Sequence, residues 1–308
     1  MTISNFKVVV LGMGVQGKKR AKVAANDLLA TVDIDKNNLD ANYHDIKDIN
    51  DKDYDAILLC TPDAVKFKTL KNILNNKKHV LVEKPLFVNC EEELLELQNI
   101  ANRNKVVLYT AYNHRFEPHF INMKNLLINK KLGKIFRLRM FYGNGTSGLV
   151  KKSEWRDEGP GVLLDIGSHL LDTLIFWFGD KKIDIKHSNS FCFENLSPDH
   201  GILTGKIDNI FIELEVSLLS WKNDFICDII GNKASAHISS LCKWGPSKFI
   251  TRKRTLPAGK PDENITTLIQ PDPTWEQEYI YFKKLIKNKV KTNLSRDIKI
   301  FNILKSSI

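Results

Sequence analysis

The sequence is poor in features that mark secreted, membrane-spanning or disulfide-stabilised proteins. Its five cysteines are widely spaced along 308 residues and include no CxxC pair, which argues against a disulfide framework or a thiolate metal site. No run of eighteen uninterrupted apolar residues occurs, so no membrane span is expected. The first residues carry no basic-then-apolar signal peptide and lead directly into a strand-like segment, so we expect a cytoplasmic location.

Motifs for binding nucleic acids or metals are also missing. The formal net charge is +10, but the basic residues are spread along the chain and form no platform with aromatic residues. We therefore expect no nucleic-acid partner; an anionic small substrate or cofactor is a simpler use of the charge. The Asp, Glu, His and Cys residues show no convincing ligand spacing, so no metal is expected.

In the first part of the sequence, short apolar runs alternate with segments of helical period. This alternation predicts βαβ units and a parallel sheet. The expected strands are 6–11, 28–34, 55–60, 79–82 and 106–109, and the expected helices are 15–26, 64–74 and 91–103. The segment before Asp55 is short, so its crossover helix is expected to be reduced.

After about residue 116 the pattern changes. Strand-like runs between 183 and 250 follow one another without long helices, which predicts an antiparallel sheet. Other expected elements are helices 116–129, 161–178, 275–287 and 295–305, a strand at 135–142 and a loop at 144–160. The sequence thus predicts an α/β protein with an N-terminal domain, 1–116, and a C-terminal domain, 117–308.

A glycine motif follows the first predicted strand and opens the first predicted helix. Gly12 allows a tight turn, Gly14 lets the backbone approach a pyrophosphate, and Gly17 allows close packing of helix and strand. The helix N-terminus favours negative charge. We predict that this loop holds a dinucleotide, with the intervening Met13, Val15 and Gln16 as part of the cofactor site.

Asp33 ends the second predicted strand, 21 residues after Gly12. A carboxylate at that point hydrogen-bonds the adenosine ribose and repels a 2′-phosphate, so the sequence favours NAD over NADP. NADP stays an alternative, because Lys18, Lys19 or Lys36 could meet a phosphate.

Glu83, Lys84 and Pro85 follow the fourth predicted strand. The carboxyl ends of parallel strands are where such sheets bind ligands. Lys84 could donate a hydrogen bond to a substrate hydroxyl and ease its deprotonation. A surface ion pair at a strand end is the alternative that the tripeptide alone leaves open.

The predicted helix 161–178 is apolar nearly all round, so it should be buried. Asp165, Ser168, His169 and Asp172 nevertheless recur at helical spacing along one face. Burying unpaired polar groups costs roughly 1–3 kcal/mol each, so this stripe needs partners or a wet cleft. His169 can serve as a base at neutral pH, with Asp165 one turn before it. A satisfied structural pair of histidine and aspartate is the alternative.

Taken together, these motifs resemble the glucose–fructose oxidoreductase/inositol dehydrogenase (Gfo/Idh/MocA) family. The stretches that carry the resemblance are VVVLGMGVQGKKRA, LLATVDID, DAILLCTPDA, HVLVEKPL, YNHRF and GPGVLLDIGSHLLDTLIFWFG. The resemblance implies an N-terminal Rossmann domain and a C-terminal α/β domain with an open, mostly antiparallel sheet. That sheet often forms the interface of a homodimer or homotetramer.

The resemblance also implies roles for individual residues. Lys84, Asp165 and His169 match the catalytic lysine, aspartate and histidine. The cofactor set gains Cys60, Thr61, Pro62, Glu83, Lys84 and Asn113. The substrate set comprises Lys84, Tyr112, Arg115, Trp155, Arg156, Asp165 and His169. The chain departs from the family at two points, because Arg20 and Lys66 stand where members often have histidines.

The sequence therefore predicts an NAD(P)-dependent oxidoreductase. Hydride would pass between the nicotinamide and a carbinol of a sugar, polyol or sugar nucleotide, in a setting such as surface-glycan biosynthesis. One alternative is an NAD-dependent glycosidase of the same family. Another is a non-catalytic cofactor-binding regulator, because a fold alone does not decide function.

Overall fold

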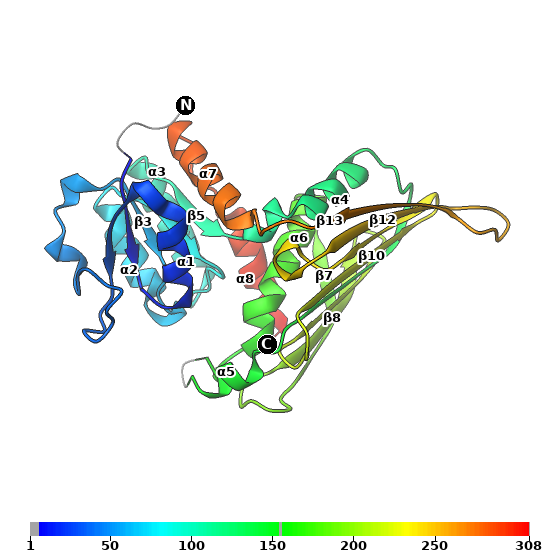
Figure 1. Ribbon diagram of the computed structural model, residues 1–308, viewed down its shortest axis with the longest axis horizontal. Coiled ribbons are helices and arrows are strands. Elements are labelled where there is room, and N and C mark those ends of the chain that lie inside the picture. The colour runs from blue at the N-terminus through cyan, green and yellow to red at the C-terminus, as the bar shows by residue number, and fades with distance from the viewer. Residues whose placement is uncertain (1–5, 154–155, 308) are drawn as a thin grey trace. The chain divides into compact units, whose positions relative to one another are not determined.

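The computed structural model describes residues 6–153 and 156–307, which form two compact units. The first contains the chain up to Asn113 together with Trp275–Asn302, and the second contains His114–Thr274 and the residues after Asn302 (Figure 1). The predicted division placed everything after residue 116 in the second domain. The structure differs because the closing segment packs with the N-terminal residues.

The first unit is built on a five-stranded parallel sheet in the order β2-β1-β3-β4-β5. Its strands are β1 (Val8–Leu11), β2 (Leu28–Val32), β3 (Ala56–Leu59), β4 (His79–Glu83) and β5 (Leu108–Ala111). Its helices are α1 (Val15–Ala24), α2 (Asp63–Asn75), α3 (Glu91–Arg103), α7 (Thr274–Lys287) and most of α8 (Ser295–Ser307). This is the predicted Rossmann arrangement. Between β2 and β3 the described chain forms two short 3-10 turns and an isolated bridge from Tyr43 to Val32 in place of a full crossover helix, as expected from the length of that segment.

Apolar side chains cover both faces of this parallel sheet. On one face Leu70, Leu94 and Phe301 pack against Val80 and Val82. On the other, Tyr279 and Phe282 of α7 join Val8, Val10 and Leu58. Continuous apolar runs are what a sheet buried on both faces requires, and α7 supplies part of the second cover.

The second unit is an eight-stranded sheet in the order β13-β12-β11-β10-β6-β9-β8-β7. Every neighbouring pair is antiparallel except β6 and β9, which run parallel. The strands are β6 (Ile135–Gly143), β7 (Ile183–Phe191), β8 (His200–Ile207), β9 (Ile210–Ser217), β10 (Asp224–Gly231), β11 (Ala234–Ser239), β12 (Ser247–Lys253) and β13 (Asp262–Leu268). The predicted open, mostly antiparallel sheet is confirmed.

One face of this sheet carries the helices α4 (Pro118–Ile128) and α6 (Ser168–Phe178) (Figure 1). Trp177 Nε1 donates to the carbonyl of Phe120 over 3.0 Å, which ties α6 to α4. The helix predicted at 161–178 is present from Gly161 onward, with a π-helical turn at Leu163–Gly167, and the predicted loop 144–160 contains a short helix, α5 (Ser147–Lys151). Asp165 lies in the π-helical turn, and His169 lies in the first turn of α6.

Replacement of Gly17 by alanine should destabilise the first unit. A Cβ at Gly17 would lie 1.9 Å from the carbonyl oxygen of Gly12, which is backbone and can only give way if the loop shifts. We expect a loss of about 1–3 kcal/mol in the free energy of unfolding, measured with urea. The control is Gly148→Ala, whose Cβ would meet no atom within 4 Å. Equal stability of the two variants would contradict the packing argument.

Candidate active site

The glycine loop has the geometry that a dinucleotide needs. Gly12 has a φ of +94°, and a Cβ there would meet the Cys60 carbonyl oxygen at 2.7 Å. Gly14 is exposed, and a Cβ on it would enter open space. Gly14 also precedes helix α1 without a side-chain cap. The amides of the first turn can therefore face an anion.

Asp33 lies at the end of β2 and is bonded to this loop. Its Oδ2 accepts hydrogen bonds from the Met13 amide at 2.6 Å and from Asn38 Nδ2 at 3.1 Å. Its Oδ1 accepts from the Asp35 amide at 3.0 Å. A carboxylate has about four lone-pair sites, so Asp33 keeps acceptor capacity for a ribose hydroxyl.

The segment after β3 contains an unsatisfied polar atom. Thr61 Oγ1 is buried and has no hydrogen-bond partner among the described residues. Cys60 beside it is a poor nucleophile, because burial, reinforced by Glu83, raises the pKa of its thiol. An orphaned hydroxyl near the glycine loop fits a group that a bound cofactor would satisfy. The residues present in this unit thus fit the dinucleotide that the motif predicts.

Lys84 stands at the end of β4 and is joined to Pro85 by a cis peptide bond. The two residues around it are buried, whereas Lys84 itself is half-buried. Arg20 Nε donates to Glu83 Oε1 at 2.6 Å, and Lys66 Nζ donates to the carbonyl oxygen of Pro85 at 2.9 Å. Both residues that depart from the family pattern therefore contact this segment.

Of the remaining predicted residues of the first unit, Tyr112 and Asn113 are buried and Pro62 is not. Tyr112 is 1% exposed, and the guanidinium of Arg296 lies 5.1 Å from its ring centre. Asn113 is 7% exposed and begins a 3-10 turn. Pro62 caps α2 and is exposed.

In the second unit, Asp165 and His169 lie one turn apart on the buried helix, as predicted. The Asp165 side chain is 43% exposed, and Arg156 Nη2 lies 3.7 Å from its Oδ2. His169 is 8% exposed, and its ring stacks on that of His114 with 4.1 Å between the ring centres. The half-exposed acid and the packed histidine are compatible with a proton-transfer site. Trp155 lies outside the described residues.

Arg115 forms a bidentate ion pair within this unit. Its Nη2 donates to Asp172 Oδ1 at 2.7 Å and its Nε to Asp172 Oδ2 at 2.9 Å. Asp172 is 1% exposed. The pair satisfies the buried carboxylate of the polar stripe, so Arg115 has a structural task besides the predicted contact with substrate.

Sequence reasoning missed three side chains around His169. The ring of Tyr142, from β6, lies 6.1 Å from His169 and 5.5 Å from His114. Lys243 Nζ donates to Tyr142 Oη at 3.0 Å. Surrounding protein lowers the pKa of Lys243, although Asp272, Glu117 and Asp165 oppose the shift. His114 was readable in the YNHRF stretch, whereas the sequence offered no signal for the pairing of Tyr142 with Lys243.

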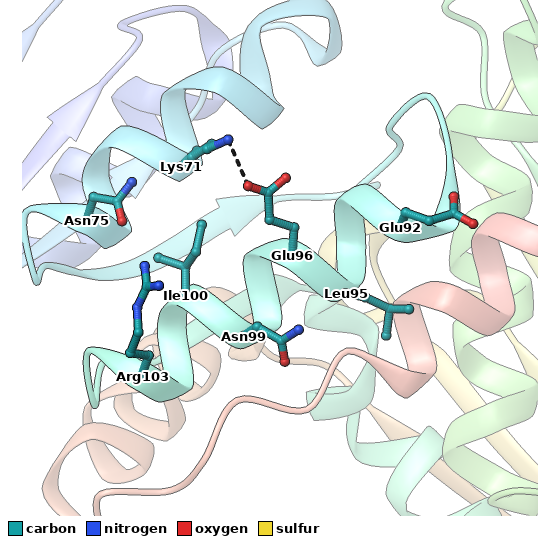
Figure 2. A pocket seen from close by; sticks show the side chains of 8 residues that line it. All are labelled: Lys71, Asn75, Glu92, Leu95, Glu96, Asn99, Ile100 and Arg103. Atoms are coloured by element: carbon teal, nitrogen blue, oxygen red, sulfur yellow. Dashed lines mark ion pairs between the residues drawn. The ribbon is translucent and has the colours of Figure 1, made fainter.

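A surface hollow of about 680 Å³ lies elsewhere, on α2 and α3. Figure 2 shows its side chains, among them Lys71 and Glu96, whose charged groups are 2.7 Å apart. None of the predicted site residues lines it. It is an open hollow on the surface of two helices, away from every motif residue, so the motif residues are the better candidate for the functional site. Among the described residues, no group of three His, Cys, Asp or Glu could hold a metal ion, and no helix is long and apolar enough to cross a membrane.

Removal of the Arg115 guanidinium should destabilise the protein. Arg115→Leu leaves the buried Asp172 carboxylate without its bidentate partner, which should cost about 3–5 kcal/mol in the free energy of unfolding. Arg139→Leu is the matched control, because Arg139 pairs with Glu213 and Glu215 while 42% of its side chain is exposed. We expect the control to change stability by less than about 1 kcal/mol. A stable Arg115→Leu variant would argue that Arg115 serves a ligand instead.

Stability should fall as the pH rises through the titration of Glu117. Burial raises the pKa of Glu117 from 4.5 to about 7, and the Cys242 amide and Lys243 offset this only in part, while Asp272 adds to it. Between these values the folded state holds a proton that the unfolded state has released, so folding is opposed increasingly toward pH 7. In urea titrations, Glu117→Gln should increase the free energy of unfolding by about 2–3 kcal/mol more at pH 8 than at pH 5. The exposed Glu276→Gln variant is the control, and an equal gain at both pH values would refute the assignment.

In comparisons with known proteins, two successive parts of the chain match two domain models of one family. Residues 6–112 match the model of an oxidoreductase family with an NAD-binding Rossmann fold, Gfo/Idh/MocA, and residues 120–237 match the Gfo/Idh/MocA C-terminal domain. Glucose-6-phosphate 3-dehydrogenase of Bacillus subtilis is 22% identical over 255 residues, which are 74% of this chain and 72% of that protein.

Two further proteins resemble this chain, one over less than half of its length and the other over nearly all of it. An uncharacterized oxidoreductase of Schizosaccharomyces pombe is 31% identical over 132 residues, or 42% of this chain, and the match spans only 35% of that protein. The structure of levoglucosan dehydrogenase in complex with NADH has a TM-score of 0.83 at 16% identity, covering 98% of this chain and 95% of that one. With both domain models matched in order along one chain, the protein belongs to the Gfo/Idh/MocA family of oxidoreductases.

Proposed function

We propose that the protein transfers hydride between a nicotinamide dinucleotide and a carbinol of a sugar, polyol or sugar nucleotide. The observation that carries the proposal is the placement of a half-exposed Asp165 and a packed His169 one turn apart on a buried helix. The similarity to glucose-6-phosphate 3-dehydrogenase supports a hydroxyl-bearing carbon of a sugar as the reacting group. A surface-glycan precursor and a cytoplasmic setting remain the finer expectations.

Each proposed catalytic residue has one task. The bound nicotinamide supplies the hydride acceptor or donor when the cofactor is present. In oxidation, an imidazole nitrogen of His169 takes the proton of the substrate hydroxyl, and the Lys84 ammonium stabilises the developing negative charge on that oxygen. Asp165 orients the substrate or the imidazole, and Arg156, 3.7 Å from its carboxylate, limits its freedom. In reduction the same proton returns from His169.

NAD is the proposed cofactor rather than NADP. Asp33 is held against the glycine loop by the Met13 amide, where its negative charge would repel a 2′-phosphate. Two lysines that could offset this charge have other contacts: Lys18 Nζ lies 2.6 Å from Asp40 Oδ2, and Lys19 Nζ lies 5.2 Å from the ring centre of Trp275. Lys36 is exposed.

Self-association through the sheet of the second unit is part of the proposal. The face of the sheet opposite α4 and α6 includes the exposed Phe211 and Ile226 beside charged residues. Exposed apolar groups on a wide sheet favour an interface with a second copy.

The function can be tested with NADH, NADPH and a panel of hexoses, hexose phosphates, inositols and sugar nucleotides. We expect tighter binding of NADH than of NADPH, followed by quenching of tryptophan fluorescence, and turnover of a panel member. His169→Asn should retain NADH binding while kcat falls by about 100- to 10,000-fold.

The matched control is His237→Asn, because His237 forms a separate histidine–aspartate pair with Asp228, 2.6 Å between Nδ1 and Oδ1. It should keep its kcat. Full turnover by His169→Asn would remove the assigned role. Release of an aglycone without net NADH would favour the glycosidase, and failure to bind either cofactor would exclude all of these enzymatic functions.

A further inference from the structure

Two buried cations in the first unit have no task in the proposed mechanism. Lys66 of α2 is 2% exposed, and Arg20 of α1 is 1% exposed. Lysine and arginine are almost never this buried unless they are paired. Their partners therefore show what the two cations hold in place.

Lys66 binds the backbone on both sides of Lys84. Its Nζ donates to the carbonyl oxygen of Glu83 at 2.8 Å and to that of Pro85 at 2.9 Å. Asp63, one turn earlier on α2, pairs with the same ammonium. One ammonium thus fixes the main chain before and after the proposed catalytic lysine.

Arg20 holds the same segment through a side chain. Its Nε donates to Glu83 Oε1 at 2.6 Å, and its Nη2 lies 2.8 Å from Glu278 Oε2 on α7. The guanidinium also stacks over Trp275, 4.3 Å from the ring centre. Burial opposes the charge of Arg20, but Glu83 and Glu278 outweigh this and raise its pKa, so it stays cationic.

We propose that Lys66 and Arg20 are positioning residues that hold the Glu83–Pro85 segment so that Lys84 meets the nicotinamide and the substrate. This inference rests on the proposed function of Lys84. A lysine side chain carries its ammonium on a flexible four-carbon stem. The ammonium can be directed to one point only if the backbone from which the stem starts is fixed. A misplacement of about 1 Å in such a site can cost about 100-fold in rate.

The chain offers a matched control for Lys66. Lys78 Nζ also donates to two backbone carbonyls of the first unit, those of Asp51 and Tyr54, and its ammonium lies 4.5 Å from the Tyr54 ring centre. Lys78 touches neither Glu83 nor Pro85 by any of these contacts. Lys66→Met and Lys78→Met therefore remove the same kind of bond from two different segments.

The experiment measures the rate at which acetic anhydride labels Lys84, by peptide mass spectrometry, with and without saturating NADH. The ratio of the two rates cancels the intrinsic reactivity of each variant. We expect NADH to slow labelling of Lys84 in the wild type and in Lys78→Met. Lys66→Met should lose most of this protection while its NADH affinity and thermal midpoint stay close to those of Lys78→Met, and Lys66→Arg should restore it.

Glu83→Gln provides a second variant should Lys66→Met not fold, because it weakens the Arg20 contact with little change in volume. It should also lose protection of Lys84. If folded Lys66→Met and Glu83→Gln both keep full protection, the positioning role is wrong while the proposed function stands. If NADH fails to protect Lys84 in the wild type although NADH binds, Lys84 does not lie at the nicotinamide, and both proposals fall.

Discussion

Each unit has a buried ion pair that supports a candidate catalytic segment. In the first unit Arg20 joins Glu83 to Glu278, and in the second Arg115 neutralises Asp172. A single partner removed from such a pair leaves a charge in a poorly solvated place. The backbone beside Lys84 and the helix that carries His169 are therefore fixed by electrostatics as well as by apolar packing.

The formal charges around Arg20 do not cancel, because one guanidinium pairs with two carboxylates, those of Glu83 and Glu278. Burial raises the pKa of Glu278 to about 7, with Arg20 opposing that shift. Arg20 bonds the carboxylate of Glu83, whereas Lys66 bonds its main-chain carbonyl. Such a cluster is costly compared with an apolar core. Here the two cations give the Glu83–Pro85 segment a fixed set of partners.

The sequence predicts structure well where an element depends on residues that are close together in the chain. Apolar runs predicted the parallel strands of the first unit, and the glycine motif predicted the turn between β1 and α1, because both depend on residues close in sequence. The position of His169 on a buried helix followed from the spacing of apolar residues alone. Fold class and family were accessible for this reason, and the roles of individual site residues stay proposals.

Pairings between distant residues could not be read in the same way. Glu278 meets Arg20 across 258 positions, and Lys243 meets Tyr142 across 101, with no local signal for either partner. An amphipathic pattern shows that the closing helices cover a core but not which core they cover. The sequence therefore predicts residues 275–302 to belong to the domain that precedes them, whereas they pack with the first unit. The π-helical turn before α6 was hidden because a local change of hydrogen-bond spacing leaves the apolar pattern almost intact.

Residues 275–302 complete the first unit, so the folding of that unit depends on a segment that the ribosome makes late. The ribosome makes the glycine loop and Lys84 early, yet Glu278, Tyr279 and Phe282 of α7 arrive only after residues 114–274, nearly all of the second unit, have been translated. Until then Arg20 has one of its two carboxylates, and one face of the sheet lacks part of its apolar cover. Domains commonly fold as they emerge, from the N-terminus onward; this one is completed almost last, so a nascent chain carries an unfinished nucleotide-binding domain through most of its own translation.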